Sequence, residues 1–179
     1  MARYGMLINT KKCVGCYACR VACQMVNGLE SDEAFIKFDE MEQGVYPNVY
    51  AEVVPVQCMH CEDAPCEAVC PTHATYTTDS GVVLVDEERC IGCKYCMAAC
   101  PYGARIQIKK TGVIEKCRFC WYEGEPGNPP RCVGTCISGA RLFGDLDDPN
   151  SEVSKLLASR EYTQLHAEFG TKPSVYYLV

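Results

Sequence analysis

Residues 90–101 contain four cysteines at spacings typical of metal ligands. Two residues separate Cys90, Cys93 and Cys96 from one another, three residues separate Cys96 from Cys100, and a proline comes next. This C-x2-C-x2-C-x3-C-P spacing is typical of loops that hold iron–sulfur clusters. Such a loop supplies three thiolates to one cluster, while the fourth cysteine reaches a second cluster. Cys100 therefore predicts a matching cysteine run elsewhere in the chain.

Three further groups of four cysteines have related spacings. Residues 13–23 repeat the C-x2-C-x2-C-x3-C spacing, with glutamine in place of the final proline. Residues 58–70 read C-x2-C-x4-C-x3-C-P, and residues 117–136 read C-x2-C-x11-C-x3-C. The chain therefore contains several runs that can exchange ligands with one another.

All 16 cysteines of the 179-residue chain fall into these groups. A cysteine content this high is typical of small disulfide-bonded secreted proteins, but C-x2-C pairs are poorly placed to bridge each other. Structural zinc ions are a second alternative, since C-x2-C pairs also occur in zinc ribbons. Two of the runs carry a third cysteine after two more residues, which fits a cubane better. We therefore expect four [4Fe-4S] clusters.

Adjacent runs resemble those of two-cluster ferredoxins, in which the fourth cysteines cross over. If the two inner groups exchange ligands in this way, and the two outer groups do the same, every cysteine is used once. A sequential pairing, in which the first group exchanges with the second and the third with the fourth, also balances. The nested exchange predicts four sets, named below after their first members: Cys13, Cys16, Cys19 and Cys136; Cys23, Cys117, Cys120 and Cys132; Cys58, Cys61, Cys66 and Cys100; and Cys70, Cys90, Cys93 and Cys96.

The charge of the chain limits its partners. The formal charge is −6, and four oxidised clusters with their thiolates would add about −2 each, for a total of about −14. Such an acidic protein is a poor partner for nucleic acid. No apolar run approaches the roughly 20 residues of a membrane-spanning helix, and the first residues lack signal-peptide organisation. We therefore expect partner subunits to bring the chain to a membrane or across it.

Apolar patterns predict short strands and helices around the cysteine groups. The stretch 27–47 is acidic, and we interpret it as an irregular surface insertion or as a docking surface for a partner subunit. Ser151 is a candidate N-cap for a helix with Val153 and Leu156 on one face. Residues 170–179 form an extended aromatic tail that lies against this chain or a partner. The predicted strands cover residues 4–8, 49–56, 74–78, 82–86, 105–109 and 113–116, and a helix is predicted over 18–26.

No serine–histidine–acid arrangement or carboxylate pair stands out, so the sequence predicts no substrate site. His60 lies between two predicted ligands, but the thiolate count is already complete, which indicates a supporting or surface residue. Phe119 and the two aromatic residues near it follow a ligand pair, where they shield a cluster or pack in the core. The cations Arg20, Lys94 and Arg118 lie within the cysteine groups, where they raise a cluster's potential or are solvated surface charges.

Five short motifs carry a resemblance to a known family. They are Cys-Val-Gly-Cys at 13–16, Cys-Met-His-Cys at 58–61, Cys-Pro-Tyr-Gly-Ala-Arg at 100–105, Phe-Gly-Asp-Leu-Asp-Asp-Pro at 143–149 and Gly-Thr-Lys-Pro-Ser-Val-Tyr-Tyr at 170–177. With them, nearly the whole chain resembles the four-cluster electron-transfer (beta) subunits of molybdopterin oxidoreductases, such as polysulfide, thiosulfate, arsenate and dimethyl sulfoxide reductases. His73 and Ile137 depart from the glycine and proline often found there in that family, but the ligands themselves are intact.

The resemblance implies the nested ligand sets and two partners. One is a catalytic subunit with a molybdenum or tungsten pterin, and the other is an integral-membrane quinol-binding anchor. It also implies a place at the membrane through these partners. We expect the extracytoplasmic (periplasmic) face, reached by export together with a signal-bearing subunit, and the cytoplasmic face is the alternative. The fold expected is α+β, with two ferredoxin-like halves related by a pseudo-twofold axis. Residues 1–48 and 117–150 are expected to form the outer half, 49–116 the inner half, and 151–179 a C-terminal helix and tail.

We therefore expect a non-catalytic subunit that relays electrons between a quinone partner and a molybdopterin site in anaerobic respiration. The absence of an apolar C-terminal segment favours a reductase of sulfur or arsenic compounds. A subunit of a formate dehydrogenase or hydrogenase is an alternative of the same kind. A zinc-stabilised interaction module without redox function is an alternative of another class.

Overall fold

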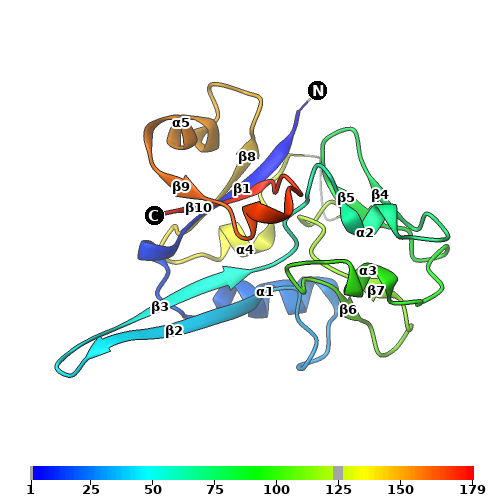
Figure 1. Ribbon diagram of the computed structural model, residues 1–179, viewed down its shortest axis with the longest axis horizontal. Coiled ribbons are helices and arrows are strands. Elements are labelled where there is room, and N and C mark those ends of the chain that lie inside the picture. The colour runs from blue at the N-terminus through cyan, green and yellow to red at the C-terminus, as the bar shows by residue number, and fades with distance from the viewer. Residues whose placement is uncertain (1, 123–126) are drawn as a thin grey trace.

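The computed structural model describes residues 2–122 and 127–179 (Figure 1). Residue 1 and residues 123–126, which belong to the inner loop of the last cysteine group, lie outside the described residues. Short helices and small sheets alternate with long connections, as expected of a small, mixed and loop-rich fold. Over the described ranges, no helix has both the length and the apolar character that crossing a bilayer requires.

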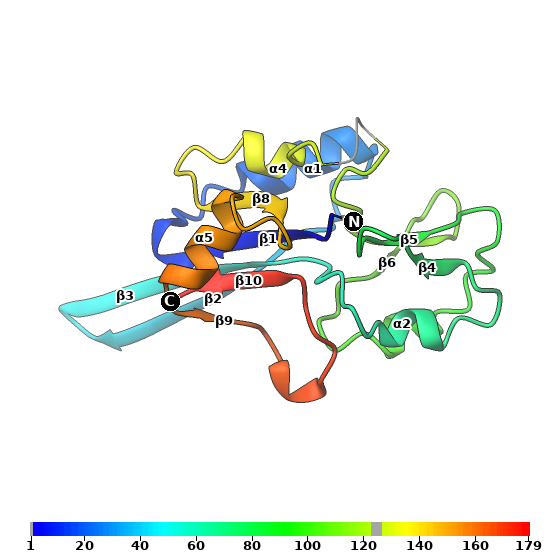
Figure 2. The same ribbon diagram turned by 90° about the horizontal axis from the view of Figure 1, so that it is seen from above.

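A four-stranded sheet in the order β8-β1-β10-β9 forms the centre of one lobe (Figure 2). β1 (Tyr4–Asn9) pairs antiparallel with β8 (Arg141–Asp145) and parallel with β10 (Val175–Leu178). β10 also pairs with β9 (Tyr162–Thr163), so it has a neighbour on each side. The strand predicted at the start of the chain is confirmed, and the aromatic tail is an interior strand of the chain itself.

One helix covers this sheet. α5 (Glu152–Ser159) begins at the predicted N-cap, where the Ser151 hydroxyl oxygen accepts a hydrogen bond from the Ser154 N–H at 3.1 Å. Val153 is buried against Leu7 and other apolar residues of β1, β8 and β10. The helix therefore packs on the core, as the apolar face predicts.

The second lobe, on the right in Figure 1, consists of two hairpins and two short helices. β4 (Thr75–Thr77) pairs antiparallel with β5 (Val83–Val85), and β6 (Ile106–Gln107) pairs with β7 (Ile114–Glu115). Both predicted hairpins are confirmed, although their paired segments are shorter than expected. The helices of this lobe are α2 (Pro65–Ala68) and α3 (Tyr95–Ala98).

Two more helices lie side by side on the first lobe (Figure 2). α1 (Ala18–Asn27) confirms the helix predicted after the first cysteines, and α4 (Arg131–Gly134) carries one cysteine of the last group. Each of the two therefore brings cysteines from a different end of the chain to the same place. Two single-turn 3-10 helices, η1 (Thr10–Lys12) and η2 (Ala167–Phe169), complete the secondary structure of the described residues.

The stretch predicted to be an irregular surface insertion contains a long strand instead. β2 (Lys37–Val45) pairs in register with β3 (Asn48–Val56), and the hairpin projects from the body as an arm (Figure 1). The prediction was wrong for residues 37–45 because pairing with the predicted strand beyond them, residue for residue, holds this acidic segment in an extended conformation. Near the tip, Gly44 has a φ of 99°, and a side chain there would collide with the carbonyl oxygen of Asn48.

Candidate metal centres

The structure brings three of the four predicted ligand sets together, each around one cavity. The Cys23 set lines about 360 Å³ of empty space, the Cys58 set about 330 Å³ and the Cys70 set about 310 Å³, counting the part open to solvent. In residues 2–122 and 127–179, no three histidine, cysteine or acidic side chains converge closely enough to hold a single metal ion. The cysteines surround spaces of similar size.

The Cys13 set is spread over η1, α1 and the loop after α4. The Asn9 N–H donates to the Ala140 carbonyl at 2.8 Å, which joins the start of η1 to the loop after Cys136. Within that loop the Ala140 N–H donates to Cys136 Sγ at 3.2 Å. Among all sixteen cysteines, Cys16 and Cys93 are exposed; Cys13, Cys70, Cys90, Cys100, Cys120 and Cys136 are partly buried; and Cys19, Cys23, Cys58, Cys61, Cys66, Cys96, Cys117 and Cys132 are buried.

The four C-x2-C loops share one backbone feature. The residue before the second cysteine has a positive φ in each: 62° at Gly15, 44° at His60, 67° at Gly92 and 51° at Phe119. This conformation turns successive N–H groups toward one side, where they can face an anion such as a thiolate or sulfide. Glycine adopts it freely, whereas a residue with a side chain is strained by roughly 1 kcal/mol or more. The recurrence indicates one kind of site in all four loops.

Burial changes the protonation of the thiols. Burial and the neighbouring thiolates raise the pKa of Cys23 and of Cys61 to about 12 each. Burial also raises the pKa of Cys132 to about 11, although the Arg141 guanidinium opposes it. These thiols are protonated at neutral pH without a metal, so binding iron as thiolates must release protons.

The fourth cysteines of two groups behave differently. Burial alone would raise the pKa of Cys70, but N–H groups of Thr75 and Thr72 bring it below the ordinary value. Burial would likewise raise the pKa of Cys136, but hydrogen bonds from the Ser138 hydroxyl and the Ala140 N–H lower it below the ordinary value. Hydrogen bonds to sulfur therefore favour the thiolate form of both cysteines.

A buried arginine without a hydrogen-bond acceptor among the described residues indicates what these cavities can hold. Arg105 is 3% exposed and lines both the Cys58 cavity and the Cys70 cavity. Its three guanidinium nitrogens are buried and make no hydrogen bond to any described residue. A buried guanidinium without an acceptor is costly, because it loses its hydration. Anionic groups with sulfur acceptors in the two cavities would satisfy it, so the donor set fits iron–sulfur clusters.

His60 supports the site from the interior. Its ring is fully buried, and its Nδ1 accepts a hydrogen bond from the Val83 N–H at 3.1 Å. Burial, together with the charges of Lys116 and Arg105, holds the pKa of His60 well below its usual value. The ring therefore stays neutral and stacks on Phe119 with centroids 3.7 Å apart. Between the two alternatives for His60, the structure favours a supporting residue over a surface residue.

The three aromatic residues near the last ligand pair have different environments. Phe119 is buried and lines the Cys23 cavity. Trp121 packs edge-on against Tyr4 with ring centroids 6.2 Å apart. Tyr122 is exposed and lies under the Arg118 guanidinium, which is 5.6 Å from its ring centroid. Of the three, Phe119 therefore has the position expected of a residue that shields a cluster.

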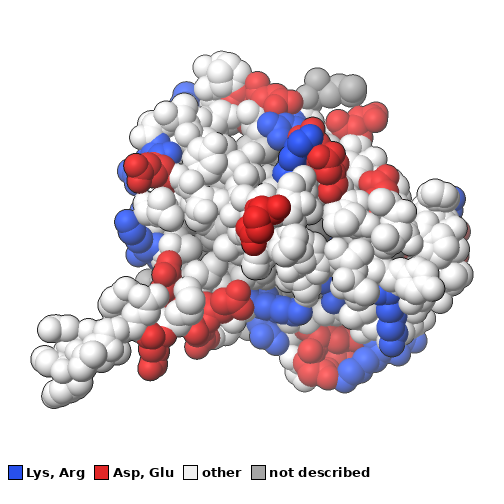
Figure 3. Space-filling view, viewed as in Figure 1, with Lys and Arg blue, Asp and Glu red and all other residues white. Residues whose placement is uncertain are grey.

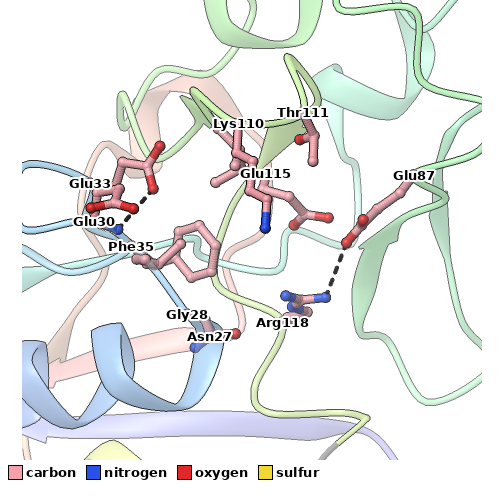
Figure 4. A pocket seen from close by; sticks show the side chains of 12 residues that line it. Asn27, Gly28, Glu30, Glu33, Phe35, Glu87, Lys110, Thr111, Glu115 and Arg118 are labelled. Carbon is pink, nitrogen blue, oxygen red and sulfur yellow. Dashed lines mark hydrogen bonds and ion pairs between the residues drawn. The ribbon is translucent and has the colours of Figure 1, made fainter.

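A further cavity without cysteines lies between the residues after α1 and the β6–β7 hairpin (Figure 4). Several of its charged groups bond within the chain. Glu33 accepts hydrogen bonds from the N–H groups of Glu30 and Lys109, and Arg118 pairs with Glu87 at 3.6 Å. Because of this pairing, Arg118 is not a free cation beside a cluster.

The buried cations of the site were not predicted from the sequence. Arg105, Lys116 and Arg141 are at most 3% exposed, whereas the predicted candidates Arg20, Lys94 and Arg118 are exposed or half-buried. A signal for two of them existed: Arg105 and Arg141 each follow the fourth cysteine of a group by five residues, both in a Gly-Ala-Arg sequence. Lys116 directly precedes Cys117 and has no comparable repeat.

Comparisons with known proteins agree with these sites. Two family models described as "4Fe-4S dicluster domain" match, one over residues 49–146 and the other over residues 12–74. Together they cover all four cysteine groups.

Several curated proteins are similar over nearly the whole chain. A subunit of the selenate reductase of Mesobacillus selenatarsenatis is 39% identical, and the match covers 97% of this chain and 70% of that protein. A subunit of the tetrathionate reductase of Salmonella typhimurium is 38% identical, with 98% and 72% covered. The arsenate respiratory reductase iron–sulfur subunit ArrB of a Shewanella species is 34% identical, with 98% and 96% covered.

Proposed function

The chain belongs to the family of iron–sulfur electron-transfer subunits of molybdopterin oxidoreductases, and we propose that its four cysteine sets hold four [4Fe-4S] clusters. It is a non-catalytic subunit. When bound, such clusters supply one-electron redox chemistry. The residues of this chain hold them, separate them from water and set their charge environment.

The main support for this proposal is that each of three cavities is lined by the four cysteines of one nested set. A sequential pairing would instead place Cys23 with the first three cysteines of the second group, yet Cys23 lines the cavity of Cys117, Cys120 and Cys132. Zinc is also disfavoured, because a structural zinc ion needs four ligands converging at about 2.3 Å, and no three such side chains converge on one point among the described residues. The shared positive φ before each second cysteine extends the proposal to the Cys13 set.

Two ferredoxin-like halves remain part of the proposal. The Cys58 and Cys70 cavities belong to the lobe with α2 and α3, and α1 and α4 bring the other two sets together on the first lobe. The turns after Cys100 and Cys136 match: Gly103 and Gly139 have φ values of 55° and 61°, and each donates its N–H to the cysteine carbonyl. The proposed boundary between residues 48 and 49 lies at the tip of the β2–β3 arm.

The proposed partners are a catalytic subunit with a molybdenum or tungsten pterin and an integral-membrane quinol-binding anchor. The relatives named for selenate, tetrathionate and arsenate reductases support the first, and they favour a sulfur, selenium or arsenic compound as the terminal substrate. We propose that these partners hold the chain at the membrane, on its extracytoplasmic face.

Metal analysis of the purified complex tests this function. We expect about sixteen iron and about sixteen acid-labile sulfide ions per chain, four of each for every cluster. We also expect molybdenum or tungsten in a co-purifying large subunit. Zinc in place of iron, without sulfide, would overturn the cluster proposal, and nickel in the large subunit would point to a hydrogenase.

The β2–β3 arm is the proposed docking element for the catalytic subunit. Residues 43–51 carry no charged side chain, and the end of the arm is white in Figure 3. Val45 and Tyr46 are 82% and 88% exposed there. At the base of the arm, the Val53 side chain lies 3.2 Å from the point where a Cβ atom at Gly15 would stand. The arm therefore starts beside the Cys13 set. A partner bound to it would lie near that end of the site.

Replacing Val45 and Tyr46 together by serine is expected to reduce the amount of catalytic subunit that co-purifies, because both side chains lose apolar contact area. The iron content of the chain should stay unchanged, since the arm tip touches no cysteine set. Phe169→Ser is the matched control, because Phe169 is 60% exposed but lies outside the arm. Equal recovery of the partner with both variants would refute this docking role.

A further inference from the structure

Three buried cations lie among the four cysteine sets, and they carry no formal ion pair with a carboxylate in the described part of the chain. Each one contacts or borders two different sets. Ordinary buried cations are paired with acids, because an isolated buried charge is strongly unfavourable. Their counter-charges must therefore come from the groups that the cysteines hold.

Arg105 stands between the Cys58 and Cys70 sets. Its side chain lines both cavities, and its nitrogens have no hydrogen-bond partner among the described residues. Burial by itself would lower the pKa of Arg105, but the thiolates of Cys66 and Cys96, one from each set, raise it. The same positive charge therefore acts on both sets.

Lys116 stands between the Cys58 and Cys23 sets. Its ammonium is completely buried and donates hydrogen bonds to the carbonyls of Val83 and Cys117, the second at 3.0 Å. Val83 lines the Cys58 cavity and Cys117 lines the Cys23 cavity. The neighbouring Glu115 is also buried, and its carboxylate accepts a hydrogen bond from the Lys116 backbone N–H at 3.1 Å.

Arg141 stands between the Cys23 and Cys13 sets. One guanidinium nitrogen is 4.0 Å from Cys132 Sγ, and both terminal nitrogens donate to Gln57 Oε1 at 3.3 Å. On the other side, Ala140, the residue directly before Arg141, donates its N–H to Cys136 Sγ of the Cys13 set at 3.2 Å. Arg141 therefore lies beside a cysteine of each outer set.

We propose that Arg105, Lys116 and Arg141 tune the reduction potentials of the clusters. Each places one fixed positive charge in one of the three gaps between successive clusters, and each raises the reduction potentials of the two clusters beside its gap. The proposal rests on the four-cluster function above. A cluster that gains an electron becomes more negative, and a nearby cation stabilises that form. The effect is strong because the charges are buried, where solvent screens them little.

The positions of the three cations also give the spatial order of the four cysteine sets through the protein. Each gap contains one cation, and the shared sets give the order Cys70, Cys58, Cys23 and Cys13. A charge in every gap keeps neighbouring potentials from being set independently. The three residues would thus act on overlapping pairs of clusters.

An EPR-monitored redox titration of the whole complex tests the proposal. The variants are Arg105→Gln, Lys116→Gln and Arg141→Gln, which remove the charge and keep an amide donor. Each is expected to shift two of the four midpoint potentials to more negative values. The pairs moved by the two arginine variants should share no cluster, whereas the pair moved by Lys116→Gln should share one cluster with each of them.

Matched variants separate charge from structure. Arg105→Lys and Arg141→Lys keep the charge and are expected to restore most of each shift. Lys94→Gln removes an exposed cation that also lines the Cys70 cavity, and it should move the potentials less than Arg105→Gln does. Iron content is measured on every variant, and a wild-type protein without iron or sulfide would refute the proposed function itself rather than the role of the cations.

Three results would overturn the role of the cations. In the first, a glutamine variant with full iron content moves no potential more than Lys94→Gln does. In the second, all four potentials move together. In the third, the lysine variants shift the potentials as far as the glutamine variants. If Arg105→Gln loses iron, Arg141→Gln and Arg141→Lys decide the question at the other end of the row.

Discussion

Cys100→Ser is expected to destroy or degrade the cluster proposed for the Cys58 set and to spare the cluster proposed for Cys90, Cys93 and Cys96. Cys100 lines the same cavity as Cys58 and is absent from the lining of the Cys70 cavity. A serine hydroxyl is a harder and poorer ligand for an iron–sulfur cluster than a thiolate. The expected product is a three-iron cluster or an empty site, which removes one of four EPR signals and lowers the iron content.

The reciprocal variant is the control for this crossing. Cys70 lines the cavity of Cys90, Cys93 and Cys96 although it follows the Cys58 loop in sequence. Cys70→Ser should therefore remove a different signal from the one that Cys100→Ser removes. The two lost signals can be told apart by adding Cys93→Ser, which should affect the same cluster as Cys70→Ser. If Cys100→Ser and Cys93→Ser remove the same signal, each cluster is held within its own loop and the nested exchange is wrong.

The sequence predicted the parts of the site that depend on local spacing. A C-x2-C loop, a hairpin around a glycine and an N-cap serine each involve residues close together in the chain. Gly81 and Gly112 have φ values of 75° and 74° in the two predicted hairpin turns, and Ser151 caps α5 as expected. Local chemistry of this kind can be recognised without a tertiary structure.

Features that depend on distant segments were missed. Lys116 is one of the most buried side chains of the protein, although a lysine is among the residues least expected inside. Its place becomes clear only when the hairpin carrying Val83 packs beside it. β2 was missed because its acidic residues obscure the strand pattern, and β8 and β9 because their partners come from the two ends of the chain.

Deleting residues 175–179 is expected to prevent the first lobe from holding its clusters. The deletion removes β10 from the middle of the sheet, and with it the buried side chains of Val175, Tyr177 and Leu178. Loss of one large buried aromatic side chain costs about 3–5 kcal/mol, and whole domains are stable by only about 5–15 kcal/mol. We expect about half of the iron to be lost, because β1 leads into Cys13 and β8 follows Cys136.

Single substitutions show whether the effect comes from packing inside this chain. The Tyr177 hydroxyl donates to the Pro55 carbonyl at 2.9 Å, so Tyr177→Phe should cost about 1 kcal/mol and Tyr177→Ala several times more. Removal of the exposed Val179 alone is the matched control and should change nothing. The readouts are iron content and the temperature at which the visible absorbance bleaches.

The alternative for the tail, contact with a partner subunit, makes the opposite prediction. In that case the deletion would reduce recovery of the catalytic subunit and leave the iron content and bleaching temperature of the isolated chain unchanged. The structure favours the first outcome because β10 is bonded on both sides by strands of its own chain, β1 and β9. β1 pairs along the whole of β10, and β9 covers Tyr177 and Leu178 on the other edge, which leaves little of the strand free to form a sheet with a partner. The tail therefore stabilises the fold of its own chain directly.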